Sequence, residues 1–263
     1  MEKNFKTLRI EERPEGVLLV AFNRPEVANA FNTEAARELH EAFHALASGA
    51  AHRCVVLTGA GDRAFCAGGD LKERNSFTDE QWHAQHQVFE RMFNSVRDCP
   101  VPVVAAVNGA AYAGGLELML QCDFAYASKN ARFALTEVSL GIMPGGGGTQ
   151  TLARAVGERR AKELVLAARP FSAEEALAWG VVNKLCEPGK VLDEALEIAR
   201  RIATNAPLSV RQARRAIHDG LHLDLASGMQ VELDAYNRLV GTEDRREGIR
   251  AFNEKRAPKF RGR

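Results

Sequence analysis

Two short apolar runs, each leading through a glycine pair to a carboxylate, constrain the fold of this chain more than any other feature. Residues 53–58 and 101–107 are rich in valine and bounded by turn-forming residues, as β-strands are. Each is followed by a glycine-rich stretch, Ala64–Asp70 or Ala111–Glu117, and then by a helical pattern. Strand, loop and helix in this order, repeated at least twice, predict an α/β fold.

The rest of the chain adds strands to this core and then helices. The pattern predicts a helix over 33–47 and further strands over 7–23, 123–127, 132–136 and 181–185. After residue 148 it becomes helical almost to the end, with a capping box at Ser172–Glu175, and helices run from Pro207 to about 254. We expect an α/β core over 1–200 and a helical C-terminal part over 201–263. The C-terminal helices carry apolar stripes that predict packing on the core or on another subunit.

Composition restricts the class of protein. Hydrophobic residues make up 46% of the chain and charged residues 26%, and no apolar run approaches the roughly 18 residues of a membrane span. A net charge of +1 gives no overall attraction to nucleic acid or to an anionic membrane. The five cysteines are widely spaced and never form C-x-x-C, which favours a reducing compartment and no thiolate metal site. The N-terminus lacks a secretory pattern, so we expect a cytoplasmic protein, or an organellar-matrix protein if the sequence is a processed form.

The glycine pairs predict an oxyanion hole. Glycine lets the backbone approach a ligand closely, and two converging N–H groups can hold an oxygen anion at about 2.7–3.1 Å. Gly114 falls in the first turn of a predicted helix, near the positive end of its dipole, and Glu117 lies on nearly the same face. The alternative is that the glycines only permit close packing and that Glu117 complements the dipole. For residues 65–70 the alternative is an ordinary turn with Asp70 capping the next helix.

A second glutamate, Glu137, stands among apolar neighbours in a segment that reads as buried. Burial would raise its pKa toward the value that suits a proton donor near neutrality. Together with Glu117 it could take a proton from one atom and deliver one to another. The alternative is a solvent-facing glutamate at the end of a strand.

Three other motifs carry less weight. His40-Glu-Ala-Phe-His44 matches the H-E-x-x-H zinc signature, but helical periodicity puts Leu39, Phe43 and Leu46 on the apolar face and both histidines toward water. The stretch 144–150 is glycine-rich but lacks the spacing of either nucleotide-phosphate motif. The basic tail 255–263 has one aromatic residue, which argues against a nucleic-acid platform; it could instead meet the phosphates of a small ligand. We expect no metal.

Taken together, the segments resemble the enoyl-CoA hydratase/isomerase (crotonase) family over nearly the whole chain. The resemblance is carried by motifs in a specific order and spacing, namely 23–30, 64–72, 108–117, Cys122-Asp123, Thr136-Glu137, 140–150 and 254–256. It implies a spiral of repeated ββα units, C-terminal helices that form trimers or dimers of trimers, and an acyl-CoA substrate without a separate cofactor. Tyr112-Ala113 departs from many relatives and leaves the acyl-chain preference open.

The same resemblance implies roles for individual residues. The N–H groups of Gly69 and Gly114 would hold the thioester oxygen, and Glu117 and Glu137 would be the catalytic acids. Family hydratases keep both glutamates, whereas typical isomerases keep only the one at Glu137, so a short-chain enoyl-CoA hydratase is implied. Contacts to coenzyme A are implied for Ala28, Gly69, Asp70, Leu71 and Lys72, and for Lys259 and Phe260 of a tail that reaches a neighbouring subunit.

Alternatives within the family are Δ3,Δ2-enoyl-CoA isomerisation and hydration of a branched or dicarboxylic enoyl-CoA such as 3-methylglutaconyl-CoA. An alternative of another class is a non-catalytic or RNA-binding protein that uses the basic tail. Residues 75–97, with Phe77, Trp82, Phe89 and Met92, either line the acyl pocket or form plain amphipathic core.

Overall fold

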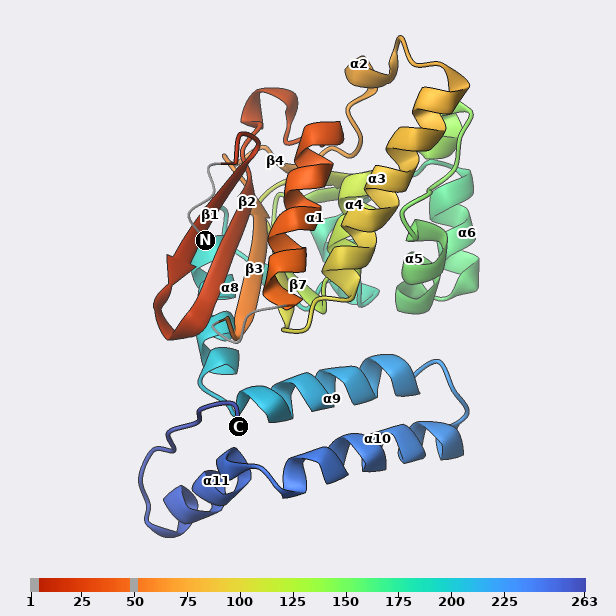
Figure 1. The fold of residues 1–263 in the computed structure, drawn as a ribbon. Helices are drawn as coiled ribbons and strands as arrows, with labels where there is room; N and C mark the ends of the chain where they lie inside the picture. The colour runs from red at the N-terminus through yellow and green to blue at the C-terminus, as the bar shows by residue number, and fades with distance from the viewer. Residues whose placement is uncertain (1–4, 48–51) are drawn as a thin grey trace.

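Two sheets form the frame of the chain in a computed structural model that describes residues 5–47 and 52–263 (Figure 1). The larger has six strands in the order β1-β2-β3-β5-β7-β10. The first pair is antiparallel and the others are parallel. Its strands are β1 (Leu8–Arg13), β2 (Val17–Phe22), β3 (Cys54–Gly59), β5 (Val103–Val107), β7 (Phe124–Ser128) and β10 (Lys184–Cys186).

The central strands of this sheet are buried on both faces. Leu18, Val20 and Phe22 of β2 belong to the main core, whereas Val17 and Leu19 belong to a second cluster with Ala195 and Leu196 of α8 (Val191–Ala203). A strand that turns alternate side chains to two apolar layers must be apolar throughout, which explains the unbroken runs in the sequence.

A smaller sheet of four short strands, in the order β4-β6-β8-β9, lies beside the first. It consists of β4 (Ala64–Cys66), β6 (Ala110–Tyr112), β8 (Arg132–Ala134) and β9 (Phe171–Ser172). The residue pattern alone read β4 and β6 as parts of glycine-rich loops, and that reading was wrong for these six residues. Two strands of three residues each, with three alanines among the six, carry no measurable alternation.

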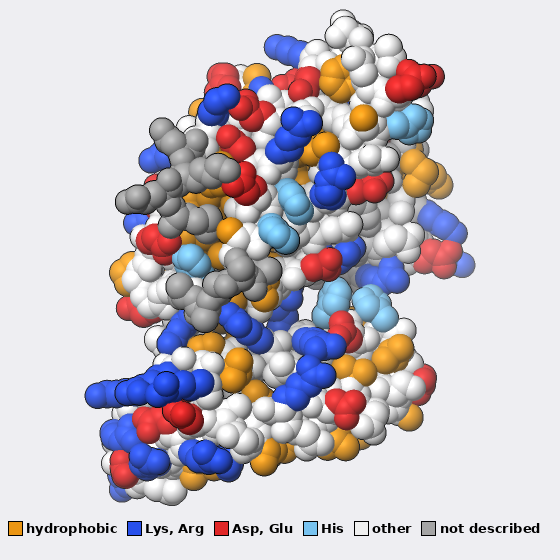
Figure 2. Space-filling view, in the orientation of Figure 1, with side chains coloured by type: hydrophobic (Ala, Val, Ile, Leu, Met, Phe, Trp, Pro, Cys, Tyr) orange, Lys and Arg blue, Asp and Glu red, His pale blue; other side chains and the backbone are white. Residues whose placement is uncertain are grey.

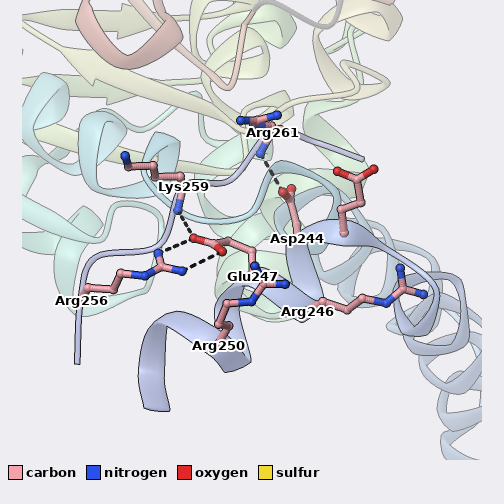
Figure 3. Close-up of a pocket in the computed structure, with 8 residues that line it drawn as sticks. Asp244, Arg246, Glu247, Arg250, Arg256, Lys259 and Arg261 are labelled. Atoms are coloured by element: carbon pink, nitrogen blue, oxygen red, sulfur yellow. Dashed lines mark hydrogen bonds and ion pairs between the residues drawn. The ribbon is translucent and has the colours of Figure 1, made fainter. Parts of the chain in front are cut away.

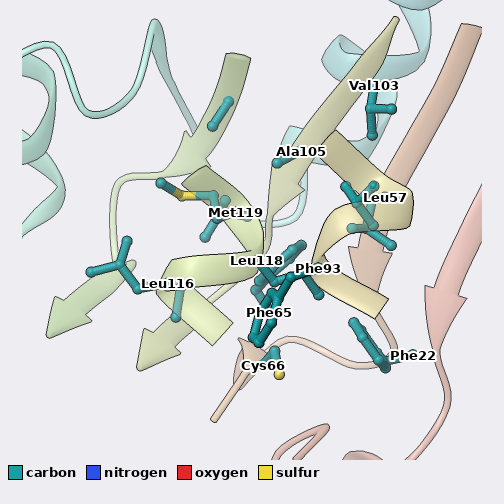
Figure 4. Packing of buried hydrophobic residues seen from close by; sticks show 14 of the residues in the cluster. Phe22, Leu57, Phe65, Cys66, Phe93, Val103, Ala105, Leu116, Leu118 and Met119 are labelled. Atoms are coloured by element: carbon teal, nitrogen blue, oxygen red, sulfur yellow. The ribbon is translucent and has the colours of Figure 1, made fainter. Parts of the chain in front are cut away.

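Strands β3 and β5 are each followed by a short strand and then a helix, and β7 is followed by β8 and a 3₁₀ helix, which confirms the repeated ββα arrangement. The helices after the first two repeats are α2 (Leu71–Arg74) with α3 (Asp79–Arg97), and α4 (Gly114–Gln121). In Figure 4, Leu116, Leu118 and Met119 of α4 lie among core side chains that include Phe65 and Phe93. Helix α4 is therefore held in the core on several sides, and Glu117 is carried into the interior with it.

Several of the remaining elements were predicted from the sequence. The predicted N-terminal helix is α1, the capping box at Ser172 and Glu175 is present, and the strand expected over 181–185 is β10, which covers 184–186. The short helices at 25–27 and 137–140 were not predicted. The bounds of the remaining elements are η1 (Pro14–Gly16), η2 (Pro25–Val27), α1 (Thr33–Ala47), η3 (Glu137–Leu140), α5 (Gly148–Val156), α6 (Glu158–Leu166), α7 (Ala173–Ala178), α9 (Pro207–Gly220), α10 (Leu225–Val240) and α11 (Glu243–Asn253).

The C-terminal helices lie below the sheets in Figure 1, where α9 and α10 run antiparallel. Arg214 of α9 joins them to the body: its guanidinium donates to Asp123 Oδ1 at 2.6 Å and to the carbonyls of Cys99 and Arg97. Large apolar side chains on these helices are exposed, among them Leu221, Leu225, Met229, Tyr236 and Phe252. Across the described ranges no helix is long and apolar enough to span a bilayer.

Candidate active site

The two glycine-rich stretches meet at one place. Phe31 N donates to Gly68 O, and Asp70 N donates back to Phe31 O, both at 2.9 Å, so the first stretch is tied to the segment before α1. Gly68 has φ +94°, and a Cβ there would lie 3.0 Å from Gly114 N at the start of the second stretch. Glycine is required at Gly68 because both its backbone conformation and the approach of α4 exclude a side chain.

Gly114 is the first residue of α4, and its amide has no partner within the helix. Ala113 before it holds φ 48° and ψ −126°, an unusual conformation for alanine that is fixed by a 2.8 Å bond from its N–H to Ala134 O. Within the described part of the chain, the N–H groups of Gly69 and Gly114 have no acceptor. Both glycines line one cavity of about 190 Å³, so the predicted oxyanion donors lie together on a space that a ligand can enter.

Glu117 lies one helical turn inside α4 and lines the same cavity, with 3% of its surface exposed. Its Oε1 accepts hydrogen bonds from Gly146 N at 2.7 Å and Gly148 N at 2.8 Å. Burial raises the pKa of Glu117, and the glycine amides offset part of that rise. The carboxylate is thus fixed in one orientation while keeping an appreciable affinity for a proton.

The glycine loop that binds Glu117 is held from the same helix. Gln121, one turn after Glu117, donates from Nε2 to Gly146 O at 2.8 Å. Glu117 therefore binds the N–H groups of this loop while Gln121 binds one of its carbonyls. Sequence reasoning discounted this loop because it does not match a phosphate motif; its amides instead bind a carboxylate of the protein.

Glu137 opens η3 and lines the cavity with 6% of its surface exposed. Neither carboxyl oxygen has a hydrogen-bond partner among the described residues. Burial, with a smaller contribution from the charge of Glu117, raises the pKa of Glu137 to about 7. The expected burial is confirmed, and the alternative of a solvent-facing side chain is wrong.

The two glutamates differ in what surrounds them. Backbone amides stabilise the ionised form of Glu117, whereas Glu137 has no such donors from other segments and is disfavoured as an anion. Near neutral pH, Glu137 is therefore the member of the pair that more readily carries a proton. Such a pair can supply a base and an acid in the same cavity.

Of the residues at 28 and 69–72 that are expected to contact coenzyme A, some line the cavity and others hold the loop beside it. Leu71 lines the cavity with Gly69, and Lys72 is exposed beside it. Asp70 caps α2 by accepting from Lys72 N, as its alternative interpretation predicted, and pairs with Arg24 at 3.0 Å. Ala28 adopts φ 53° and accepts from Ala67 N, which fixes the loop behind Gly69.

Lys259 lies in a C-terminal tail that is hydrogen-bonded to α11 (Figure 3), and Phe260 is the next residue of this tail. Asp244 accepts from the N–H groups of Arg261 and Gly262, and Glu247 pairs with Arg256. Lys259 lines a larger cavity of about 560 Å³ at this end of the molecule, rich in arginine, and the Phe260 ring lies near Gly248. Figure 2 shows Lys and Arg side chains gathered in the region of α11 and the tail. Neither residue lines the glutamate cavity of its own chain, so their contact to coenzyme A stays a prediction.

Residues 75–97 were expected either to line the acyl pocket or to form core, and the segment does both. Trp82 and Phe89 line the cavity, whereas Met92 is fully buried in the core and Phe77 is not part of the lining. Further lining residues, to which sequence reasoning gave no place in an acyl pocket, are Phe31, Arg74, His86, Phe93, Leu140, Ile142 and Met143. Helical spacing could have indicated His86 and Phe93, which follow Trp82 and Phe89 by one turn.

The H-E-x-x-H segment lies on α1 as its periodicity predicted. Leu39 and Phe43 are buried, while Glu41 and His44 are exposed and His40 is half-buried with Nδ1 3.2 Å from Arg91 O. Throughout the described ranges no three His, Cys, Asp or Glu side chains lie where they could hold a metal ion.

Comparison with known proteins gives one consistent result. Residues 12–263 match the family model described as enoyl-CoA hydratase/isomerase. The short-chain-enoyl-CoA hydratase of Clostridium acetobutylicum is 38% identical over 94% of this chain and 95% of its own. The mitochondrial methylglutaconyl-CoA hydratase of Mus musculus is 36% identical over 99% of this chain and 84% of its own. The crystal structure of an enoyl-CoA hydratase from Bacillus anthracis superposes with a TM-score of 0.96 at 41% identity, covering 98% of this chain and all of that one.

Proposed function

Because the chain belongs to the enoyl-CoA hydratase/isomerase family, we propose that it is an enoyl-CoA hydratase that adds water reversibly to a trans-2-enoyl-CoA to give a 3-hydroxyacyl-CoA. The observation that carries this proposal is the pair of buried glutamates on one cavity with two free backbone N–H groups. Glu117 is favoured as the anion by its amide donors, and Glu137 is favoured as the acid by its unpartnered burial.

In this mechanism the thioester oxygen accepts hydrogen bonds from the N–H groups of Gly69 and Gly114. Negative charge grows on that oxygen as water attacks, so these donors stabilise the transition state more than the ground state. Removing one donor of this type typically raises the barrier by about 2.7–4 kcal/mol.

The glutamates divide the proton transfers. Glu117 takes a proton from the water that attacks the β-carbon, and Glu137 gives a proton to the α-carbon. The new bonds are C–O at the β-carbon and C–H at the α-carbon, and the C=C double bond becomes single. The proton that Glu117 gains replaces the one that Glu137 gives, so the pair returns to its starting state after one proton passes between them through solvent.

Isomerisation is the nearest alternative, because moving a double bond needs only one acid in contact with the substrate. The amides of Gly146 and Gly148 favour hydration over this alternative, since they orient a second carboxylate that an isomerase does not need. The basic tail supports the RNA-binding alternative only weakly, because Asp244 and Glu247 already engage part of it.

A spectrophotometric assay tests the proposal. Crotonyl-CoA added to the purified protein should lose its conjugated thioester absorbance, and a panel of longer and branched enoyl-CoA substrates would rank the acyl preference. No loss of absorbance with any member of the panel, together with retention of RNA that declines with salt, would favour the non-catalytic alternative.

We further infer that the chain forms trimers or dimers of trimers in the cytoplasm or an organellar matrix. The apolar side chains exposed on α9 and α10 support burial against another copy, since such a surface is costly in water. Light scattering coupled to size-exclusion chromatography would give the mass of the assembly, and a monomer would contradict the inference.

A further inference from the structure

One cation, Arg74 at the end of α2, lines the cavity of the two glutamates. Among the described residues of that lining it is the only Lys or Arg side chain, and it forms no ion pair there. The neighbouring Glu73 directs Oε2 to Thr33 N at 2.9 Å and to Gln85 Nε2 at 2.6 Å instead. The charge of Arg74 is therefore left without a directly bound carboxylate.

The guanidinium is nevertheless held in a defined position. Its Cζ lies 4.0 Å from the ring centroid of Trp82 and 4.9 Å from that of Phe89, so two aromatic rings of α3 contact it. Its Nε donates to Gln85 Oε1 at 2.6 Å, and the buried Gln85 is itself fixed by its bonds to Thr33 and Glu73. The Nε edge is thus occupied, and the two terminal nitrogens keep their N–H groups for a ligand.

The partly buried positive charge of Arg74 is unfavourable unless an anion binds to it. Burial lowers the pKa of Arg74, which means that the protein environment disfavours its charge, and Glu73 only partly compensates. A carboxylate matches the fork of terminal N–H groups and can accept two parallel hydrogen bonds. It would also need such a cation, because the ionised Glu117 otherwise repels an anionic ligand in this cavity.

We propose that Arg74 is a specificity-determining residue that binds a carboxylate at the far end of the acyl chain, so that the site accepts enoyl-CoA thioesters of short dicarboxylic acids. This inference rests on the proposed hydratase function. A Cβ built on Gly69 lies 4.0 Å from Arg74 Cζ, which puts the cation close to the expected thioester site and favours a chain of about five carbons. The apolar Leu140, Ile142 and Met143 of the same cavity would contact the chain itself.

The test compares two substrates that differ only in charge at the far end. Glutaconyl-CoA carries a carboxylate, and 5-methylhex-2-enoyl-CoA carries an isopropyl group of similar shape in its place. The measured quantity is the ratio of kcat/KM for glutaconyl-CoA to kcat/KM for the neutral substrate. In Arg74→Met this ratio should fall about tenfold to a hundredfold, mainly through KM for glutaconyl-CoA.

Two further variants sharpen the result. Arg74→Lys keeps the charge but loses the fork, so its ratio should fall between the wild-type and Arg74→Met values. Arg91→Met removes an exposed arginine of α3 outside the cavity, and its ratio should equal that of the wild type. Circular dichroism and a melting curve establish that each variant is folded.

The possible failures are distinguishable. Hydration of the neutral substrate with a ratio that Arg74→Met and Arg74→Lys leave unchanged overturns the role of Arg74 and leaves the hydratase function standing. An equal loss with both substrates also overturns it, because the guanidinium would then serve coenzyme A or the fold. A wild-type protein that hydrates neither substrate nor crotonyl-CoA overturns the proposed function and this inference together.

Discussion

The backbone N–H of Gly148 donates a 2.8 Å hydrogen bond to Glu117 Oε1, joining the first residue of α5 to the interior of α4. Gly146 adds a second donor to the same oxygen at 2.7 Å. Two amides from a glycine loop therefore orient one carboxylate in a cavity where burial would otherwise favour its neutral form. The proposed base depends for its position on a segment about thirty residues away in sequence.

Substituting Gly148 should disturb this base without removing it. A Cβ at Gly148 would lie 3.0 Å from Cγ and Oε1 of Glu117 and from Cδ1 of Leu135, so Gly148→Ala requires these side chains to move by a few tenths of an ångström. We expect kcat for crotonyl-CoA to fall at least about tenfold, since displacements of this scale misalign acid–base groups. Gly241→Ala is the control, because its Cβ meets no heavy atom within 4 Å. Equal activity of both variants would contradict the orienting role.

Replacing either glutamate by glutamine should remove one proton transfer and keep the shape. Glu117→Gln and Glu137→Gln are each expected to lower kcat for crotonyl-CoA hydration by at least ~10²-fold with an unchanged circular dichroism spectrum. Glu163→Gln, at an exposed position on α6, serves as the control. Near-normal turnover in either active-site variant would exclude that glutamate from the chemistry.

Stability should depend on pH through Glu137. Its pKa is raised in the folded protein from 4.5 to about 7, so the folded state binds the proton more tightly than the unfolded chain does. The free energy of unfolding should therefore fall as pH rises from about 4.5 through 7, by up to about 3 kcal/mol from this group. Urea unfolding of the wild type and of Glu137→Gln across this range measures the effect. The difference between their stabilities should grow with pH, and a constant difference would rule out the raised pKa.

Arg214 should hold the C-terminal helices against the body. Arg214→Ala removes the pair with Asp123 and the bonds to two backbone carbonyls, and leaves Asp123 without this partner. We expect a loss of about 2–3 kcal/mol in the free energy of unfolding, the scale of hydrogen bonds to a charged group. The substitution should increase the rate of amide hydrogen exchange more in α9 than in β3 or β5. Arg215→Ala, whose guanidinium pairs with Asp219 at an exposed site, should change stability little. A similar cost for both variants would show that the anchoring bonds contribute nothing specific.

Much of this fold could be predicted from the sequence because its main strands are strongly patterned. Strands β2, β3 and β5 lie between two apolar layers, so their sequences are continuous apolar runs, which are easily told from polar loops. Glu137 is buried as predicted, but Leu140, Ile142 and Met143, the apolar neighbours that made its segment read as buried, are exposed. The position of Gly114 at a helix start followed from the strand that precedes it.

Other parts of the site depend on contacts between distant segments. The loop of Gly146 and Gly148 looks like a flexible linker in sequence, and only the folded chain places a carboxylate against its amides. Arg74 follows a lysine and a glutamate in a charged stretch with no motif of its own, and its stacking on Trp82 depends on how the chain packs α2 against α3. Periodicity describes which face of one element is apolar, and it carries no information on pairs that tertiary structure brings together.

The most direct test of the central claim measures whether an oxygen atom from water enters the product. Crotonyl-CoA is incubated with the protein in water enriched in heavy oxygen, and the product is analysed by mass spectrometry. The account predicts 3-hydroxybutyryl-CoA with one heavy oxygen at the β-carbon, formed by the wild type and reduced at least ~10²-fold in both Glu117→Gln and Glu137→Gln. A wild-type protein that only moves the double bond, without incorporating oxygen, would contradict it.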